Sequence, residues 1–156
     1  MATSWLHKAA MIASVLAPLA LAGCMGGADE GTVIARTADG SEHRFAVQIA
    51  DTQDSRRQGL MFVTELGANE GMLFDFKEER QVAFWMQNTL IPLDMIFARS
   101  DGTIANVHAN ARPRDTTSIP SDGAVQFVLE IPGGRSAEIG LKAGDTLVHP
   151  RMNAGE

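Results

Sequence analysis

The densest group of side chains that could do chemistry lies between Trp85 and Asp94. Asn88 and Thr89 follow the tryptophan, and Asp94 comes after a short turn. We expect these three polar side chains to meet at one end of a sheet, where they could hold a sugar hydroxyl, an amide or an ion beside the indole. In the alternative, which we favour, Asn88 and Asp94 satisfy backbone amides of the connection over residues 88–93, and Trp85 belongs to the core.

Three further side chains could extend such a site. The Arg57 guanidinium suits a carboxylate or phosphate ligand, but it could instead pair with Asp54 or with Asp94. His108 and Glu130 lie on the faces of expected strands. Either could line a cleft, although solvated strand faces carry such residues routinely.

Two functional hypotheses follow from these residues. The first, which we favour, is a non-catalytic module that binds a small polar ligand, a glycan or a protein partner through residues 85–94. The second is a hydrolase or metal-assisted enzyme that uses Asp94, His108 and Glu130, since a carboxylate and a histidine can act as an acid/base pair. Convergence of these three side chains in one cleft would favour the enzyme, and their dispersal would favour a binding or structural role.

Motifs for other chemistries are absent from the sequence. It contains no glycine-rich phosphate loop, no G-x-S-x-G nucleophile elbow and no H-E-x-x-H. His43, His108 and His149 stand singly, without a second histidine at strand or helix spacing. We therefore expect no metal and no cofactor.

Most of the chain shows the two-residue period of β-strands. Val125, Phe127, Leu129 and Ile131 alternate with other residues, which predicts a strand with one buried face. Asp-Gly pairs at residues 39–40 and 101–102 predict two antiparallel hairpins. Expected strands cover residues 32–36, 43–49, 72–76, 82–86, 94–99, 103–108 and 125–131, with a last strand ending at residue 148; we place 82–86 centrally because it is apolar on both faces.

Two short segments are typical of helices instead. Residues 52–58 can be capped by Asp51 or Thr52 and stopped by Gly59, and residues 136–141 have Ser136 as an expected N-cap. About eight short strands with two helical turns indicate a mainly β fold, either an antiparallel β-sandwich or a closed barrel.

The amino terminus is typical of an exported lipoprotein. Lys8 precedes an apolar run over residues 9–22 that is too short to span a membrane as a helix. The run ends in Leu-Ala-Gly-Cys24, which resembles the bacterial lipobox; in the alternative, the signal is an ordinary one and Cys24 is incidental. We expect a signal peptide over 1–23, lipid attachment at Cys24, a flexible tether over 24–31, one domain over 32–150 and a C-terminal tail over 151–156.

These features predict a membrane-anchored protein that faces the periplasm or the cell exterior. Acyl chains on Cys24 would be its contact with the membrane, and Met25 in place of aspartate favours the outer membrane in a host that has one. The net charge is −6, and removal of residues 1–23 takes away one of 13 basic and none of 19 acidic residues, which leaves −7. An acidic chain without a basic cluster longer than Arg56-Arg57 is not expected to bind nucleic acid.

Several motifs, in order along the chain, resemble the family called domain of unknown function 192 (DUF192). They are residues 57–61 (RQGLM), 71–74 (GMLF), 84–97 (FWMQNTLIPLDMIF), 128–130 (VLE) and 140–145 (GLKAGD), and the resemblance extends from Phe45 to Val148. The long motif from Phe84 to Phe97 is the most specific. The resemblance implies a compact β-sandwich of jelly-roll type that is often exported, and it implies no reaction.

Overall fold

The computed structural model describes residues 28–152, so the expected signal peptide and Cys24 lie outside the described residues. Within this range the fold is mainly β, with nine strands and two short helices. None of the helices in residues 28–152 is long and apolar enough to cross a membrane. The elements are β1 (Thr32–Arg36), β2 (Glu42–Ala50), α1 (Gln53–Gln58), β3 (Glu70–Arg80), β4 (Ala83–Phe84), β5 (Leu93–Ala98), β6 (Ile104–Ala111), β7 (Ile119–Pro120), β8 (Val125–Pro132), α2 (Arg135–Glu138) and β9 (Thr146–Val148).

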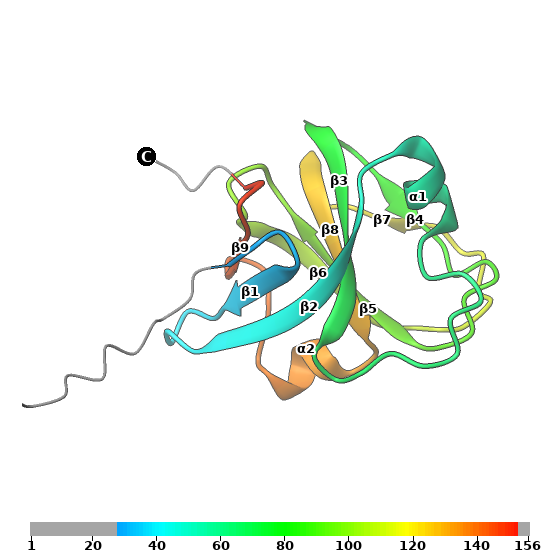
Figure 1. Cartoon of the computed structure of the whole chain (residues 1–156), viewed down its shortest axis with the longest axis horizontal. Coiled ribbons are helices and arrows are strands. Elements are labelled where there is room, and N and C mark those ends of the chain that lie inside the picture. The colour runs from blue at the N-terminus through cyan, green and yellow to red at the C-terminus, as the bar shows by residue number, and fades with distance from the viewer. Residues whose placement is uncertain (1–27, 153–156) are drawn as a thin grey trace, which may run out of the picture.

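Seven strands form one curled sheet in the order β6-β5-β8-β3-β2-β1-β9 (Figure 1). Its two ends approach each other at one place, an isolated bridge between Thr103 and Thr146. Nearby, the Leu147 amide donates to the carbonyl of Gly102 at 2.8 Å. Gly102 has φ of 84°, and a Cβ there would collide with the Leu147 carbonyl, so the close approach requires glycine. The sheet is a half-barrel; the expected sandwich or closed barrel is not confirmed.

The two expected hairpins are confirmed. β1 pairs antiparallel with β2, and β5 pairs antiparallel with β6. The expectation of a purely antiparallel sheet is wrong, because β2 and β3 are parallel. The chain between them contains α1 and is long enough to carry the chain back to the starting end of the sheet.

Both faces of the central strands are buried. On β8, Phe127, Leu129 and Ile131 pack in one hydrophobic cluster with residues of β1, β2 and β9. Val128, on the opposite face, packs in a second cluster with residues that include Leu60 and Met86. The expectation that this strand buries only one face is therefore wrong, because α1, β4 and the loops around them cover the other face.

Residues 82–86 do not form the expected central strand. Only β4 is extended, and it pairs with β7 in a separate two-stranded sheet. Val82 exchanges hydrogen bonds with Ser121, and the Met86 amide donates to the Asp115 carbonyl at 2.8 Å. Phe84 and Met86 pack in the second cluster against the large sheet, whereas Trp85 is exposed, so the segment buries only one side.

The two helices begin differently. Thr52 caps α1 in a reciprocal pair with Ser55, and Gly59 ends the helix, so the expected caps are confirmed. For α2, the expected N-cap Ser136 is wrong: the N-cap is Gly134, with φ of 88° and no side-chain cap. The free amides of this helix are bonded instead by the carboxylate of Asp94, which lies far away in sequence.

Candidate functional site

A cavity of about 200 Å³ lies between the large sheet, α1 and β4. Glu130 of β8 and Phe74 of β3 line it from the sheet, and Phe84 and Trp85 line it from the segment that covers the sheet. Thr89 completes the wall. A second cavity, which also contacts Phe84 and Trp85, adjoins it on the side of residues 116–118.

Glu130 is the unusual residue of this cavity. Its side chain faces the same way as its register partners Met72 on β3 and Met95 on β5, and only 4% of the residue is exposed. Burial raises the pKa of its carboxyl to about 8. Within residues 28–152 it forms no hydrogen bond or ion pair. The carboxyl is therefore mainly protonated at neutral pH and has free hydrogen-bonding capacity in the cavity.

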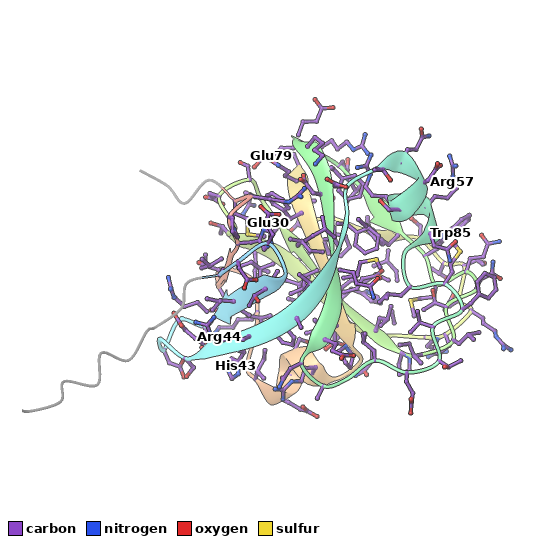
Figure 2. All side chains as sticks on the ribbon, viewed as in Figure 1. Glu30, His43, Arg44, Arg57, Glu79 and Trp85 are labelled. Atoms are coloured by element: carbon purple, nitrogen blue, oxygen red, sulfur yellow. The ribbon has the colours of Figure 1, made fainter. Side chains whose placement is uncertain are left out.

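Aromatic rings form much of the cavity wall. The Phe84 ring packs edge-on against Phe74, with centroids 5.0 Å apart, and against Phe76 and Phe97 at 6.2 and 6.0 Å. Trp85 is 53% exposed and lies at the rim near Arg57 (Figure 2). The interpretation of Trp85 as a core residue is therefore wrong, because its segment covers the sheet and the indole points outward.

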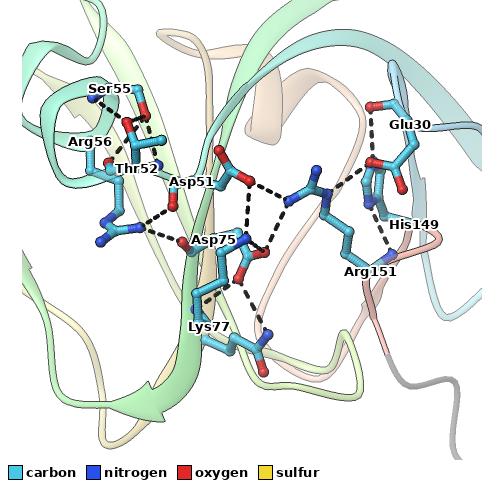
Figure 3. A network of polar contacts seen from close by, with 10 residues as sticks. Glu30, Asp51, Thr52, Ser55, Arg56, Asp75, Lys77, His149 and Arg151 are labelled. Atoms are coloured by element: carbon cyan, nitrogen blue, oxygen red, sulfur yellow. Dashed lines mark hydrogen bonds and ion pairs between the residues drawn. The ribbon is translucent and has the colours of Figure 1, made fainter.

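Two arginines on α1 also line the cavity, and both guanidinium groups are bonded elsewhere. Arg56 donates to the backbone carbonyls of Asp51 and Asp75 at 2.8 and 2.9 Å (Figure 3). Arg57 pairs with Asp54 at 3.4 Å, and both of these side chains are exposed. Of the two expected partners of Arg57, Asp54 is confirmed and Asp94 is wrong.

Asn88 and Thr89 contribute differently from each other. Asn88 has φ of 56°, its carbonyl accepts from the Phe62 amide at 2.9 Å, and its side-chain nitrogen lies 4.0 Å from the Met61 sulfur. The Thr89 hydroxyl donates to the Gln87 carbonyl at 3.4 Å and borders the cavity. Only Thr89 of the pair lines the cavity.

Asp94 is fully buried away from the cavity. One carboxylate oxygen accepts from the amides of Asn110 and Gly134 at 2.7 and 2.8 Å. The other accepts from the amide and hydroxyl of Ser136 at 2.7 and 2.6 Å. The expectation that residues 88–93 supply the donors is wrong, as is the expected meeting of Asp94 with Asn88 and Thr89. Asp94 links β5 to β6 and α2, which is a structural role.

Asp94, His108 and Glu130 do not come together in one cleft. Asp94 and Glu130 lie on neighbouring strands, but the alternation of side chains places them on opposite faces of the sheet. His108 is exposed and lines a separate cavity with Arg112 and Asp115. No residue that lines this cavity also lines the Glu130 cavity.

A network of charges that the sequence analysis missed lies beyond α1, on the other side of Arg56 (Figure 3). Arg151 bonds to Glu30, Asp51 and Asp75 at 2.8, 2.9 and 3.3 Å, and Lys77 bonds to both aspartates at 3.0 Å. Its members are up to 121 positions apart in the chain, so no local pattern could have indicated it. Among the described residues, no group of three or more His, Cys, Asp or Glu side chains is arranged to hold a metal ion.

Four of the predicted site residues line the main cavity: Arg57, Trp85, Thr89 and Glu130. Phe74, Phe84 and Leu60 also line it and were not predicted as site residues. The alternation of Phe74 and Phe76 on one strand was an available signal for an aromatic face.

Two solved structures are similar to this chain. A protein from Sinorhizobium meliloti 1021, described only provisionally as a transcription regulator, is 43% identical, with a TM-score of 0.74 over 75% of this chain and 91% of that one. A protein of unknown function from Novosphingobium aromaticivorans is also 43% identical, with a TM-score of 0.72 over 75% of this chain and 83% of that one. No curated protein matches. The family model of DUF192, described as an uncharacterised ACR, matches residues 34–149. The chain belongs to the DUF192 family.

Proposed function

We propose that this protein is a non-catalytic cell-envelope module that binds a small ligand in the cavity above Glu130. The observation that carries the proposal is the Glu130 carboxyl itself, which is buried, unpaired within residues 28–152 and borders a cavity. Arg135 Nε is the one fully buried side-chain nitrogen or oxygen without a partner among residues 28–152, so the unpaired Glu130 oxygens reach the space of the cavity. A ligand in the cavity can therefore hydrogen-bond to this carboxyl without displacing a protein group.

The loop that continues from the cavity-lining residues Gly59, Leu60 and Met61 supports the same proposal. Phe62 is 63% exposed and has φ of 64°, and its amide bonds to Asn88, which also has positive φ. Positive φ is uncommon for a bulky residue and costs free energy. Strained residues of this kind collect at ligand sites, where the surrounding structure holds them.

Export and lipid attachment at Cys24 belong to the proposal. Figure 1 shows β1, where the described part of the chain begins, at the opposite end of the domain from α1 and β4. A domain anchored through its amino terminus would therefore present the cavity away from the bilayer, open to ligands. The regulator assignment of the Sinorhizobium protein is not extended to this chain, because a net charge of −6 opposes binding to DNA.

Native mass spectrometry of the full chain, gently purified from its host, tests the binding role. We expect a small molecule to copurify with the parent and with Glu138→Gln, a control at an exposed carboxylate. Glu130→Gln should lose it. A parent protein with no bound molecule, or a Glu130→Gln protein that retains the same molecule, would contradict the proposal.

Substitution of the thiol tests the anchor. Cys24→Ser should release the protein from membranes, because acyl attachment would be lost and no described helix can span a bilayer. Carbonate-washed membranes from cells that express either form provide the measurement. Recovery of the serine variant in the membrane pellet would show that the lipoprotein assignment is wrong.

A further inference from the structure

We propose that the ligand of the Glu130 cavity carries a primary ammonium group, which binds between the Glu130 carboxylate and the rings of Phe84 and Trp85. This inference rests on the proposed function and specifies its ligand. It selects cationic amines with a small apolar body over the glycans and neutral polar ligands that the sequence analysis considered.

The charge distribution in the cavity is the first argument. Glu130 lacks a cationic partner although Arg56 and Arg57 line the same cavity. Arg56 is held by two backbone carbonyls and Arg57 by Asp54, so neither guanidinium is bonded to Glu130. A buried carboxyl is stabilised in its charged form only by an opposite charge or by hydrogen-bond donors. A ligand ammonium supplies both.

The aromatic wall is the second argument. The faces of aromatic rings attract cations. Within this part of the fold, Arg56 and Arg80 already lie over the Phe76 ring, 5.3 and 4.8 Å from its centroid. The Phe84 and Trp85 rings line the cavity beside Glu130. Aromatic side chains and a carboxylate thus line one cavity, and these are the groups that bind ammonium cations in proteins.

Size and polarity are the third argument. A cavity of about 200 Å³ is smaller than the roughly 300–1,000 Å³ of sites for drug-sized ligands. Apart from Glu130 and the arginines, the polar side chains that line it are Gln58, Gln87 and Thr89. A primary ammonium group has three donors, and the cavity offers it the Glu130 carboxylate and the side-chain oxygens of Gln58, Gln87 and Thr89 as acceptors.

Binding of an ammonium should depend on pH through Glu130. The empty site holds a mainly neutral carboxyl at pH 7, because burial raises its pKa to about 8, and the bound cation requires the charged form. The other charged groups at the cavity, Arg56 and Arg57, keep their charge over this range. His108 shares the sheet face but lines another cavity. Affinity should thus increase about tenfold from pH 6 to pH 7 and level off above pH 8.

Fluorescence of Trp85 provides the measurement. Trp5, the only other tryptophan, lies in the expected signal peptide, so the processed protein, or the full chain with Trp5→Phe, reports on Trp85 alone. The probes are 2-phenylethylamine, 2-phenylethanol and 3-phenylpropionate, which share a phenyl body and differ in the charge of the head group. We expect the amine to bind about tenfold or more tightly than the alcohol near pH 8, and the propionate to bind most weakly.

Two substitutions assign the effect to the proposed contacts. Glu130→Gln preserves the shape of the side chain and should remove the pH dependence and lower affinity for the amine about tenfold or more, while Glu138→Gln changes neither. Phe84→Leu should lower affinity for the amine more than for the alcohol, and it gives an independent result if Glu130→Gln does not fold. Equal binding of alcohol and amine, or pH dependence that survives in Glu130→Gln, would overturn the ammonium assignment and leave the cavity as a binding site. If none of the probes binds and no molecule copurifies, both proposals are wrong.

Discussion

Asp94 and Glu130 are buried carboxyl groups on neighbouring strands, and they differ in what surrounds them. Asp94 accepts four hydrogen bonds from three residues. Glu130 has two methionines as register partners, and burial is the one cause that raises its pKa. Because hydrogen bonds within the fold satisfy both oxygens of Asp94, we assign Asp94 a structural role. Because no protein group bonds to the Glu130 carboxyl, we propose Glu130 as a ligand-binding residue.

Substitution of Asp94 should destabilise the domain strongly. Asp94→Ala leaves two part-buried amides and the buried amide and hydroxyl of Ser136 without an acceptor, so we expect the free energy of unfolding to fall by about 3 kcal/mol or more. Asp94→Asn should cost nearly as much, because each oxygen accepts two donors and the new amide group would face two of them. Urea unfolding of both variants gives the values. Asp94→Ala with parental stability would refute the structural role.

Arg57→Ala provides the matched control for this experiment. Arg57 pairs with Asp54 and not with Asp94, so the effects of Arg57→Ala and Asp94→Ala should add to within about 0.5 kcal/mol. A larger coupling would mean that the two side chains interact in solution.

The Glu130 carboxyl should make stability depend on pH in the opposite direction to a paired carboxylate. The pKa of this carboxyl is about 8 in the folded protein and near 4.5 without burial, as in the unfolded chain. The folded state therefore binds the proton more tightly. Stability should therefore fall as pH rises from about 5 to about 8, by an amount on the order of 3–5 kcal/mol from this group alone. Chemical unfolding of the parent and of Glu130→Gln over that range measures it. The parent curve should decline relative to that of Glu130→Gln, and parallel curves would contradict the buried, unpaired state.

At the scale of elements, the short helix α1 and its C-cap set one side of the cavity. Gly59 ends α1 with φ of 48°, and its amide bonds to the Ser55 carbonyl. A Cβ at this position would lie 3.3 Å from the tip of the Phe74 ring. The glycine thus permits both the sharp turn after the helix and the close approach of this turn to the sheet.

Gly59→Ala should therefore destabilise the domain and disturb the cavity. We expect a loss of about 1–2 kcal/mol, because alanine is strained at this φ and its methyl group contacts Phe74. Thermal unfolding gives the loss, and the emission of Trp85 should change as well. Gly40→Ala is the control: φ is also positive there, at 88°, but no atom lies within 4 Å of the added carbon, so its cost should reflect backbone strain alone. A cost for Gly59→Ala no larger than that of Gly40→Ala would contradict both the contact with Phe74 and the added strain of the Gly59 backbone at φ 48° and ψ −140°.

The sequence was most informative where a few adjacent residues determine an element. The Asp-Gly turns predicted both hairpins, and Thr52 and Gly59 predicted the limits of α1, because these signals act within a few residues. The parallel pairing of β2 with β3 and the position of residues 82–86 depend on contacts between distant segments, such as Val82 with Ser121. For the same reason Glu130 could be proposed as a site residue, but its burial could not be predicted.

At the scale of the whole molecule, Arg151 connects the two ends of the described chain. It joins Glu30, just before β1, to Asp51, which directly follows β2, and to Asp75, which lies within β3. The two aspartates also share Lys77, and hydrogen bonds from Arg151 and Lys77 lower the pKa of Asp51 to about 2. Burial opposes the ionisation of Asp75, but hydrogen bonds from Lys77 and Gln126 outweigh it and lower its pKa. Both carboxylates thus remain charged to low pH.

Loss of Arg151 should weaken the folded state at neutral pH and less so in acid. Arg151→Ala removes contacts with exposed Glu30, partly exposed Asp51 and buried Asp75, and chiefly because of the buried contact we expect a loss of about 1–2 kcal/mol near pH 7. A carboxylate whose pKa is lowered on folding adds stability above its unfolded pKa near 4 and loses it as pH falls toward the folded value. The difference between parent and variant should therefore be full above about pH 5 and shrink toward about pH 2. Arg36→Ala, which breaks an exposed pair with Glu42, should cost about 0.5 kcal/mol or less under the same conditions. Urea unfolding across this pH range provides the measurement. The network would not hold the ends of the described chain together if Arg151→Ala cost as little as Arg36→Ala. The same conclusion would follow if the cost of Arg151→Ala did not shrink in acid.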